Sequence, residues 1–168
     1  MRVYRLANLR DPTNAFSGEG ARRVAGRWHP AGLAIVYTSS SQALALLEVL
    51  VHAELSQLKT IGYAFAVDIP DELIETPDLK SLPAGWNHPR RSDHARAFGL
   101  EWAASKRSLA LAVPSVIVPQ ERNVLINPAH PDFRALAIGN AVPLPFDERL
   151  IKAVSAPGAR GPRRRRGR

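Results

Sequence analysis

The chain has 168 residues, of which 45% are hydrophobic and 23% are charged, and it contains no cysteine. This length and balance are typical of one globular domain with its own core, and they exclude a disordered polar tract. The missing cysteines exclude a disulfide scaffold and a thiolate metal site. The first ten residues, MRVYRLANLR, form no apolar signal segment, and no apolar run is long enough to cross a membrane, so we expect a cytoplasmic protein.

The formal net charge of +8 comes mainly from one end of the chain. Six arginines lie in the last nine residues, and without them 17 basic residues face 15 acidic ones. We therefore expect a nearly neutral domain over residues 1–152 and a disordered tail over residues 153–168, because the tail combines like charges with Pro and Gly. Such a tail could contact nucleic acid non-specifically, but a solvated tail is the simpler interpretation.

Short strand patterns and two helix patterns alternate irregularly along the chain. The expected strands are 3–6, 33–38, 61–69, 111–118, 124–126, 135–138 and 142–146. Helical spacing of apolar residues predicts helices over 41–58 and 94–107, the first with serine N-cap candidates at 39–41. Residues 11–26 predict a long loop of the functional kind, and residues 71–91 an irregular segment. Few helices scattered among short strands predict an α+β fold in a single compact domain.

The N-terminal segment is the part of the domain best suited to hold an anion. Residues 1–30 carry six arginines and two acids, whereas residues 48–78 carry seven acids and one lysine. Within AGRWHPAG, glycines permit a close backbone approach, Arg27 offers a bidentate grip on phosphate, and Trp28 could wall a pocket. The residues alone favour a simpler alternative, in which Trp28 anchors a surface loop to the core.

Glu48 is the most informative single residue. The surrounding segment ALALLEVLVHAEL is apolar almost all round, which predicts a helix that is buried on most sides. A carboxylate there is costly unless it is paired or opens into a pocket. Helical spacing places Glu48 on one face with Ser41, Leu44 and His52. A functional carboxylate and a carboxylate on the one wet stripe of the helix, touching His52, are equally good interpretations at this point.

Other polar residues carry weaker signals. Tyr37 could stack on a planar ring or belong to the core, and Ser115 lacks a nucleophile motif. The five histidines show no metal-ligand spacing, so we expect no metal site. The sequence GEG at residues 18–20 lacks the rest of a phosphate-loop or dinucleotide fingerprint, which argues against a Rossmann or P-loop protein.

Nine short motifs, in order, cover about residues 2–150. They are Tyr4-Arg5, GEGA at 18–21, GRW at 26–28, VYTSSS at 36–41, ALALLEVLVH at 43–52, LPAGW at 82–86, VPSVIVP at 113–119, NVLINPAHPDF at 123–133 and FDERL at 146–150. Together they resemble the RES domain, the toxin of RES–Xre toxin–antitoxin systems. The arginine, glutamate and serine for which that family is named match Arg27, Glu48 and Ser115. One departure is His29, which stands where the family usually has asparagine in Gly-Gly-Arg-Trp-Asn.

The resemblance implies an ADP-ribosyltransferase-like core and an enzyme that uses NAD as substrate, with no cofactor. It implies that NAD loses nicotinamide by hydrolysis or phosphorolysis. Glu48 would then stabilise the oxocarbenium-like sugar, while Arg27, and Arg5 second, would clamp the pyrophosphate. Tyr37 would stack on nicotinamide, and Ser115 would hydrogen-bond ribose or carboxamide. The implied catalytic residues are Arg27, Glu48 and Ser115, and the implied substrate-binding residues are Arg5, Arg27, Trp28, Tyr37, Ser39, Ser41, Ser115 and Asn127.

The resemblance also implies an Xre-like antitoxin partner in a hetero-oligomer, with DNA contacted only through the antitoxin. His29 and residues 86–96 are candidate lips of the cleft that this partner would block. Two other functions stay open. One is an ADP-ribosyltransferase that modifies a protein target and shares every site residue. The other is a non-enzymatic nucleic-acid-binding module that acts through the basic tail, which the nearly neutral domain disfavours.

Overall fold

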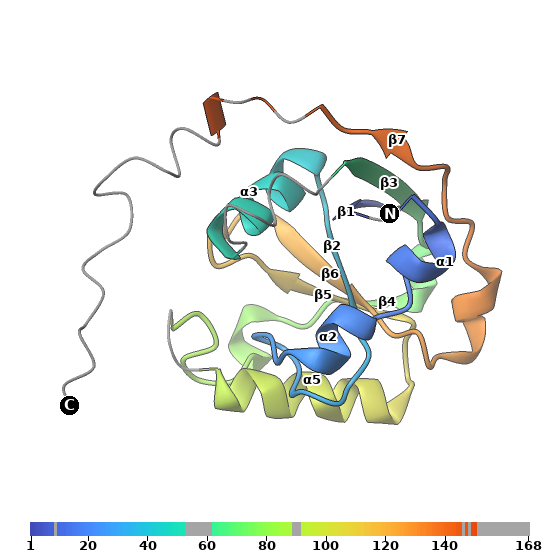
Figure 1. Ribbon diagram of the computed structural model, residues 1–168. Coiled ribbons are helices and arrows are strands. Elements are labelled where there is room, and N and C mark those ends of the chain that lie inside the picture. Colours follow the sequence, from blue (N-terminus) through green and yellow to red (C-terminus); the bar gives the residue numbers. More distant parts are fainter. Residues whose placement is uncertain (9, 53–61, 89–91, 146, 148, 151–168) are drawn as a thin grey trace, which may run out of the picture.

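The computed structural model describes residues 1–8, 10–52, 62–88, 92–145, 147 and 149–150. Its strands are β1 (Arg2–Ala7), β2 (Val36–Ser39), β3 (Tyr63–Asp68), β4 (Ile74–Glu75), β5 (Ala110–Pro114), β6 (Arg122–Ile126) and β7 (Val142–Pro143). They form one sheet in the order β4-β5-β6-β2-β1-β3-β7 (Figure 1). Among these described strands, only β4 and β5 pair in parallel. This single sheet with a few helices confirms the predicted α+β class.

The two faces of the sheet bury different side chains, because successive residues of a strand point to opposite faces. One face carries an apolar core that includes Val3, Val36, Phe65, Val124 and Ile126, and the register places Arg5 and Thr38 on the same face. The other face carries the polar residues of the site. Antiparallel register places Tyr37 opposite Leu125, and Ser39 opposite Asn123, on this second face.

Helix α3 (Gln42–His52) packs on the second face over β1 and β2, and its Ala45 belongs to one apolar cluster with Leu6 and Ala64. Ser41 begins the helix, since its hydroxyl accepts the backbone N–H of Leu44 at 3.0 Å. The helix therefore starts as the serine run predicts. Its predicted end at residue 58 lies outside the described residues.

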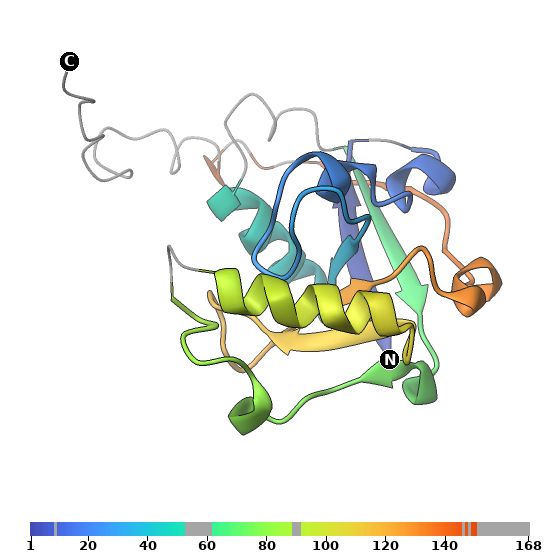
Figure 2. The same cartoon turned by 90° about the horizontal axis from the view of Figure 1, so that it is seen from below.

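Helix α5 (Asp93–Ser105) lies across β5 and β6 on the same face (Figure 2). Trp102 is fully buried between the helix and Leu111, and its indole N–H donates to the Ser108 hydroxyl at 2.8 Å. At Gly99 the helix passes so close to the backbone of Trp28 that a β-carbon would overlap the Trp28 carbonyl oxygen. Helix α5 thus fixes the position of the loop that contains Arg27.

Two segments differ from their predictions. Residues 11–26 contain helices α1 (Pro12–Ala15) and α2 (Glu19–Arg23) rather than a continuous loop. The Asp11 carboxylate caps α1 by accepting the Thr13 N–H at 3.1 Å, and proline stands at the first turn, a local signal that the Gly and Asn content obscured.

The predicted strand 135–138 is the second difference. A 3₁₀-helix, η3 (Pro131–Ala135), occupies its start, and only an isolated bridge joins Ile138 to Val67. In residues 71–91 the structure adds the short 3₁₀-helices η1 (Asp71–Leu73) and η2 (Leu79–Ser81) around β4. Strand β5 ends at Pro114. Of the predicted strand 142–146, the described residues 142–145 are in a strand only at Val142 and Pro143, and residue 146 lies outside the described residues.

The predicted tail, residues 153–168, lies outside the described residues. Among the residues that the structure does describe, no helix is long and apolar enough to cross a membrane.

We expect Gly99→Ala to lower the free energy of unfolding by about 1–3 kcal/mol, because the added methyl group overlaps the Trp28 carbonyl. Gly20→Ala is the matched control, since a β-carbon there meets nothing within 4 Å. Its effect should stay within about 0.5–1 kcal/mol and be stabilising, through the lower entropy of the unfolded chain. Urea unfolding of both variants makes the comparison, and equal stabilities would contradict the close packing of α5 on this loop.

Candidate active site

Glu48 is held by two side chains from the β5–β6 region. The Ser115 hydroxyl donates to Glu48 Oε1 at 2.8 Å, and the Asn123 side-chain amide donates to the same oxygen at 2.5 Å. The Asn123 carbonyl oxygen in turn accepts from the Ser39 hydroxyl at 2.8 Å. Helix α3 thus presents its carboxylate to a polar row that strands β2 and β6 place side by side.

The second carboxylate oxygen of Glu48 lies beside His52, whose side chain is exposed. The His52 Nε2 atom lies 3.5 Å from Oε2, and the Glu48 side chain is 21% exposed. Burial by itself raises the pKa of Glu48, but interactions with His52, Asn123 and Ser115 outweigh it, so the pKa lies below its ordinary value. The group is therefore a carboxylate at neutral pH, with Oε1 anchored by two donors and Oε2 next to His52.

Ser115 is completely buried and its hydroxyl is already committed. While donating to Glu48, it accepts the backbone N–H groups of Ile117 at 3.0 Å and Val118 at 3.1 Å. Because two backbone N–H groups fix the position of this hydroxyl, it holds the Glu48 carboxylate in one orientation. A direct contact with ribose or carboxamide, as the resemblance implies, stays a prediction.

Tyr37 lies on β2, two residues before Ser39, so its side chain points to the same face. Its hydroxyl lies 2.8 Å from His29 Nδ1. Burial raises the pKa of this hydroxyl above its ordinary range, so it is neutral. The charges of Arg27, Glu48 and Arg96 also act on the pKa of this hydroxyl, although burial has the largest effect.

Arg27 and Trp28 lie in a loop that is tied down from both sides. The Arg27 Nη1 atom donates to the carbonyl oxygens of Trp86 and His88, each at 2.8 Å. Trp28 is only 2% exposed and stacks on Trp86 with ring centroids 6.1 Å apart. Arg96 of α5 donates to the Gly26 carbonyl at 2.9 Å. Trp28 therefore serves as the core anchor of this loop.

Three other predicted substrate-binding residues have structural partners. The buried Arg5 guanidinium donates to the carbonyls of Ala15 at 2.7 Å and Tyr37 at 2.9 Å, and burial lowers its pKa to about 10. Ser41 caps α3 and donates to Glu121 at 2.5 Å. The Asn127 amide donates to the Ala103 carbonyl at 2.9 Å, joining the end of β6 to α5.

The structure thus brings Ser39, Glu48 and Ser115 into one hydrogen-bonded cluster, and it places Arg5 and Asn127 in other contacts. The cluster also contains Asn123, which our sequence analysis did not select. The alternation of side chains along β6 places Asn123 on the same face as Leu125 and opposite to Val124. Its hydrogen bond with Ser39, however, joins residues that are 84 positions apart in the sequence. That pairing is not visible in the local pattern.

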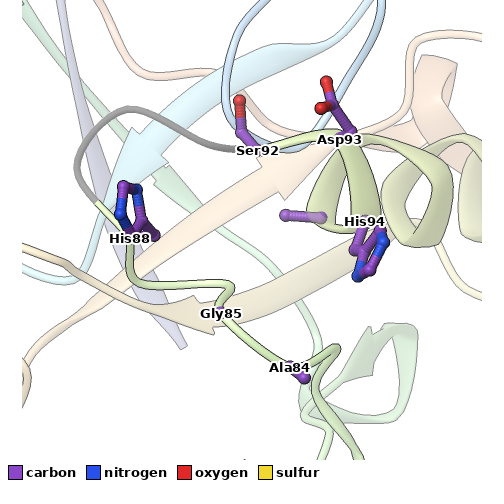
Figure 3. Close-up of a pocket in the computed structure, with 7 residues that line it drawn as sticks. Ala84, Gly85, His88, Ser92, Asp93 and His94 are labelled. Atoms are coloured by element: carbon purple, nitrogen blue, oxygen red, sulfur yellow. The ribbon is translucent and has the colours of Figure 1, made fainter.

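Two surface cavities lie away from Glu48. One, of about 480 Å³, is lined at the N-terminus of α5 by Ser92, Asp93 and His94, and opposite them by Ala84, Gly85 and His88 (Figure 3). It adjoins the carbonyl pair that Arg27 binds, since His88 belongs to both. The other, of about 410 Å³, is lined by Arg10, Pro12, Asn140 and Ala141. The described residues form no cluster of His, Asp and Glu that could hold a metal ion.

Comparison with known proteins matches residues 2–147 to the RES domain. The chain belongs to the RES domain family. A curated relative from Sphingobium sp. (strain YBL2), named Prs ADP-ribosylating toxin, is 41% identical over 140 residues, covering 82% of this chain and 87% of the relative. A Toxin Res from Photorhabdus laumondii is 41% identical over 155 residues, covering 91% and 99%.

A solved structure, the toxin–antitoxin complex MbcT–MbcA of M. tuberculosis, has a chain with a similar fold. The TM-score is 0.67 at 20% identity, and the match covers 91% of this RES domain chain and 87% of the other. The family's named residues are thus arranged in two groups here. Glu48 and Ser115 are in direct contact, and Arg27 belongs to the loop that contacts Trp86 and Arg96.

We expect Asn123→Ala to raise the pKa of Glu48, because it removes one donor to the carboxylate and leaves the burial that opposes ionisation. A carbon-detected NMR titration of the Glu48 carboxyl group measures this shift. Asn14→Ala, which alters an exposed contact with Asp11, is the control and should leave the Glu48 pKa unchanged. An unchanged value in Asn123→Ala would show that Asn123 does not stabilise the ionised form.

Proposed function

We propose that this chain is a toxin that cleaves the bond between nicotinamide and ribose in NAD and transfers the ADP-ribosyl group to water or phosphate. The observation that supports it most is the Glu48 carboxylate, which is ionised, anchored on one oxygen and partly exposed. A preorganised negative charge stabilises the positive charge that develops on the sugar as the bond breaks.

The reaction needs little else from the protein. The electron pair of the breaking bond goes to the nicotinamide nitrogen, so the leaving group departs neutral and takes no proton. Water forms the new bond to the sugar carbon through its oxygen and loses a proton to solvent, whereas phosphate forms this bond through an oxygen that is already anionic and needs to lose none. Tyr37, whose hydroxyl is held by His29, offers a fixed aromatic surface for nicotinamide, and Arg27 offers charge for the pyrophosphate.

The proposal includes a protein partner. Curated relatives of 36–41% identity are named toxins, and the solved structure with the similar fold is a toxin bound to its antitoxin. We propose that an Xre-like antitoxin neutralises this chain in a hetero-oligomer in the cytoplasm. DNA would be contacted through the antitoxin. The purified chain alone would then be active.

Purified protein should release nicotinamide from NAD, and Glu48→Gln should slow the release at least about a hundredfold, because the neutral amide cannot stabilise a developing cation. Glu72→Gln, at an exposed position of η1, is the matched control and should leave the rate unchanged. Assays with and without inorganic phosphate identify the acceptor. Absence of release by a folded, antitoxin-free sample would contradict the proposal.

The name of the Sphingobium relative favours a second function, ADP-ribosyl transfer to a protein. Under this alternative, NAD labelled in its adenylate part should label one band in a cell lysate, and turnover in buffer should be negligible. Glu48→Gln should abolish the label, because both reactions break the same bond. Rapid turnover in buffer without any labelled band would exclude it in favour of NAD degradation.

A further inference from the structure

The His29 ring is buried between two sets of polar partners. Its side chain belongs to a residue that is 2% exposed. Nε2 lies 3.0 Å from the Ala21 carbonyl oxygen and 3.1 Å from the Val24 carbonyl oxygen. Nδ1 lies 2.8 Å from the Tyr37 hydroxyl oxygen. The ring therefore joins the end of α2 to the aromatic side chain on β2.

These partners define the tautomer of the neutral ring. Carbonyl oxygens only accept, so Nε2 must carry the proton. Nδ1 is then an acceptor, and the Tyr37 hydroxyl must donate to it. The hydroxyl oxygen accepts the Trp28 backbone N–H at 3.3 Å. The Tyr37 hydroxyl thus donates to His29 and accepts from the Trp28 backbone, and both partners lie in the loop that follows Arg27.

The fit around this contact is close. A β-carbon at Gly26 would lie 2.7 Å from His29 Nδ1 and 2.8 Å from the Tyr37 hydroxyl. The rings of His29 and Tyr37 are tilted, with centroids 5.4 Å apart. Neither ring can turn without losing its partner.

We propose that His29 is a positioning residue of the active site, which holds Tyr37 in place through its neutral Nε2–H tautomer and makes NAD turnover depend on that tautomer. This inference rests on the proposed function, in which Tyr37 contacts nicotinamide. His29 itself touches no substrate. It acts by removing the rotational freedom of the Tyr37 ring before substrate binds.

The proton on the ring gives this role a pH dependence. An imidazolium carries hydrogens on both nitrogens, so the Tyr37 hydroxyl loses its acceptor and must reverse. Burial lowers the pKa of His29, the two carbonyls partly oppose this, and the Arg96 charge on α5 adds to it. Arg27 and Glu48 are the other charges that act at Tyr37. The neutral ring is present above that lowered pKa, and turnover should fall as pH decreases through it.

Two substitutions test the contacts of the two ring nitrogens of His29 separately. Asparagine places its amide near the position of Nδ1, so His29→Asn keeps an acceptor for Tyr37 and cannot titrate. Glutamine places its amide near the position of Nε2, so His29→Gln keeps the donor to Ala21 and Val24 and loses the Tyr37 acceptor. We expect His29→Asn to keep KM for NAD within about threefold of the wild-type value. Its turnover should no longer fall at low pH, because asparagine does not titrate. His29→Gln should raise KM about five- to tenfold, the equivalent of one hydrogen bond.

Thermal unfolding of both variants identifies the folded fraction. If His29→Gln behaves as wild type while His29→Asn is impaired, the ring serves only the carbonyls of α2, and the inference is overturned. Adding His29→Gln to Tyr37→Phe should change KM by less than about twofold, because the hydroxyl is already gone. A full effect in that background also overturns it.

A measurement without turnover keeps the two proposals separate. Nitrogen NMR shifts of the His29 ring report the tautomer directly, and we expect the Nε2–H form at pH 7. An Nδ1–H form would overturn the role of His29 whatever the protein does with NAD. A wild-type protein that shows the Nε2–H form but does not cleave NAD would instead count against the proposed function.

Discussion

A carboxylate in the middle of a mostly apolar helix is the constraint on which this site depends. Burying it without partners would cost several kcal/mol and would raise its pKa until it became neutral. Ser115 and Asn123 supply the hydrogen bonds that offset this cost, and both point at one oxygen of Glu48. The helix must therefore hold Glu48 beside the residue that follows β5 and the start of β6. Fold stability and the charge of the carboxylate are thus coupled through the same two contacts.

The other half of the site depends on α5. Gly99 lets this helix reach the Trp28 backbone, and Arg96 holds the Gly26 carbonyl. The loop they fix carries Arg27 and His29, and His29 holds Tyr37 on β2. Strand β2 pairs with β6, which carries the donor to Glu48. These contacts hold two helices and a loop in fixed positions against adjacent strands of one sheet. This is the rigid support that a preorganised site requires.

The sequence predicted the parts of this arrangement that follow from local periodicity. Alternation located most strands, and helical spacing placed His52 beside Glu48, as the 3.5 Å separation shows. The strand register that sets Asn123 against Ser39 joins distant parts of the chain, so no local pattern could reveal it. The burial of Arg5 is of the same kind, because its partners Ala15 and Tyr37 meet only after folding. The resemblance to the RES domain identified candidate site residues, and the structure showed which partners each of them contacts.

That distinction bears on which arginine can hold a pyrophosphate. A guanidinium has five N–H donors, and a phosphate is best gripped by the fork formed by Nε and one terminal nitrogen. Arg5 uses both Nε and Nη1 on backbone carbonyls inside the domain, so its fork is occupied. Arg27 uses Nη1 alone for the carbonyls of Trp86 and His88. Among the described residues, no hydrogen bond from its Nε or Nη2 accompanies these contacts, so this fork is the part that we propose for the anion. Under the proposed function, Arg27 would therefore hold the loop and bind phosphate at the same time, without exchanging one partner for the other.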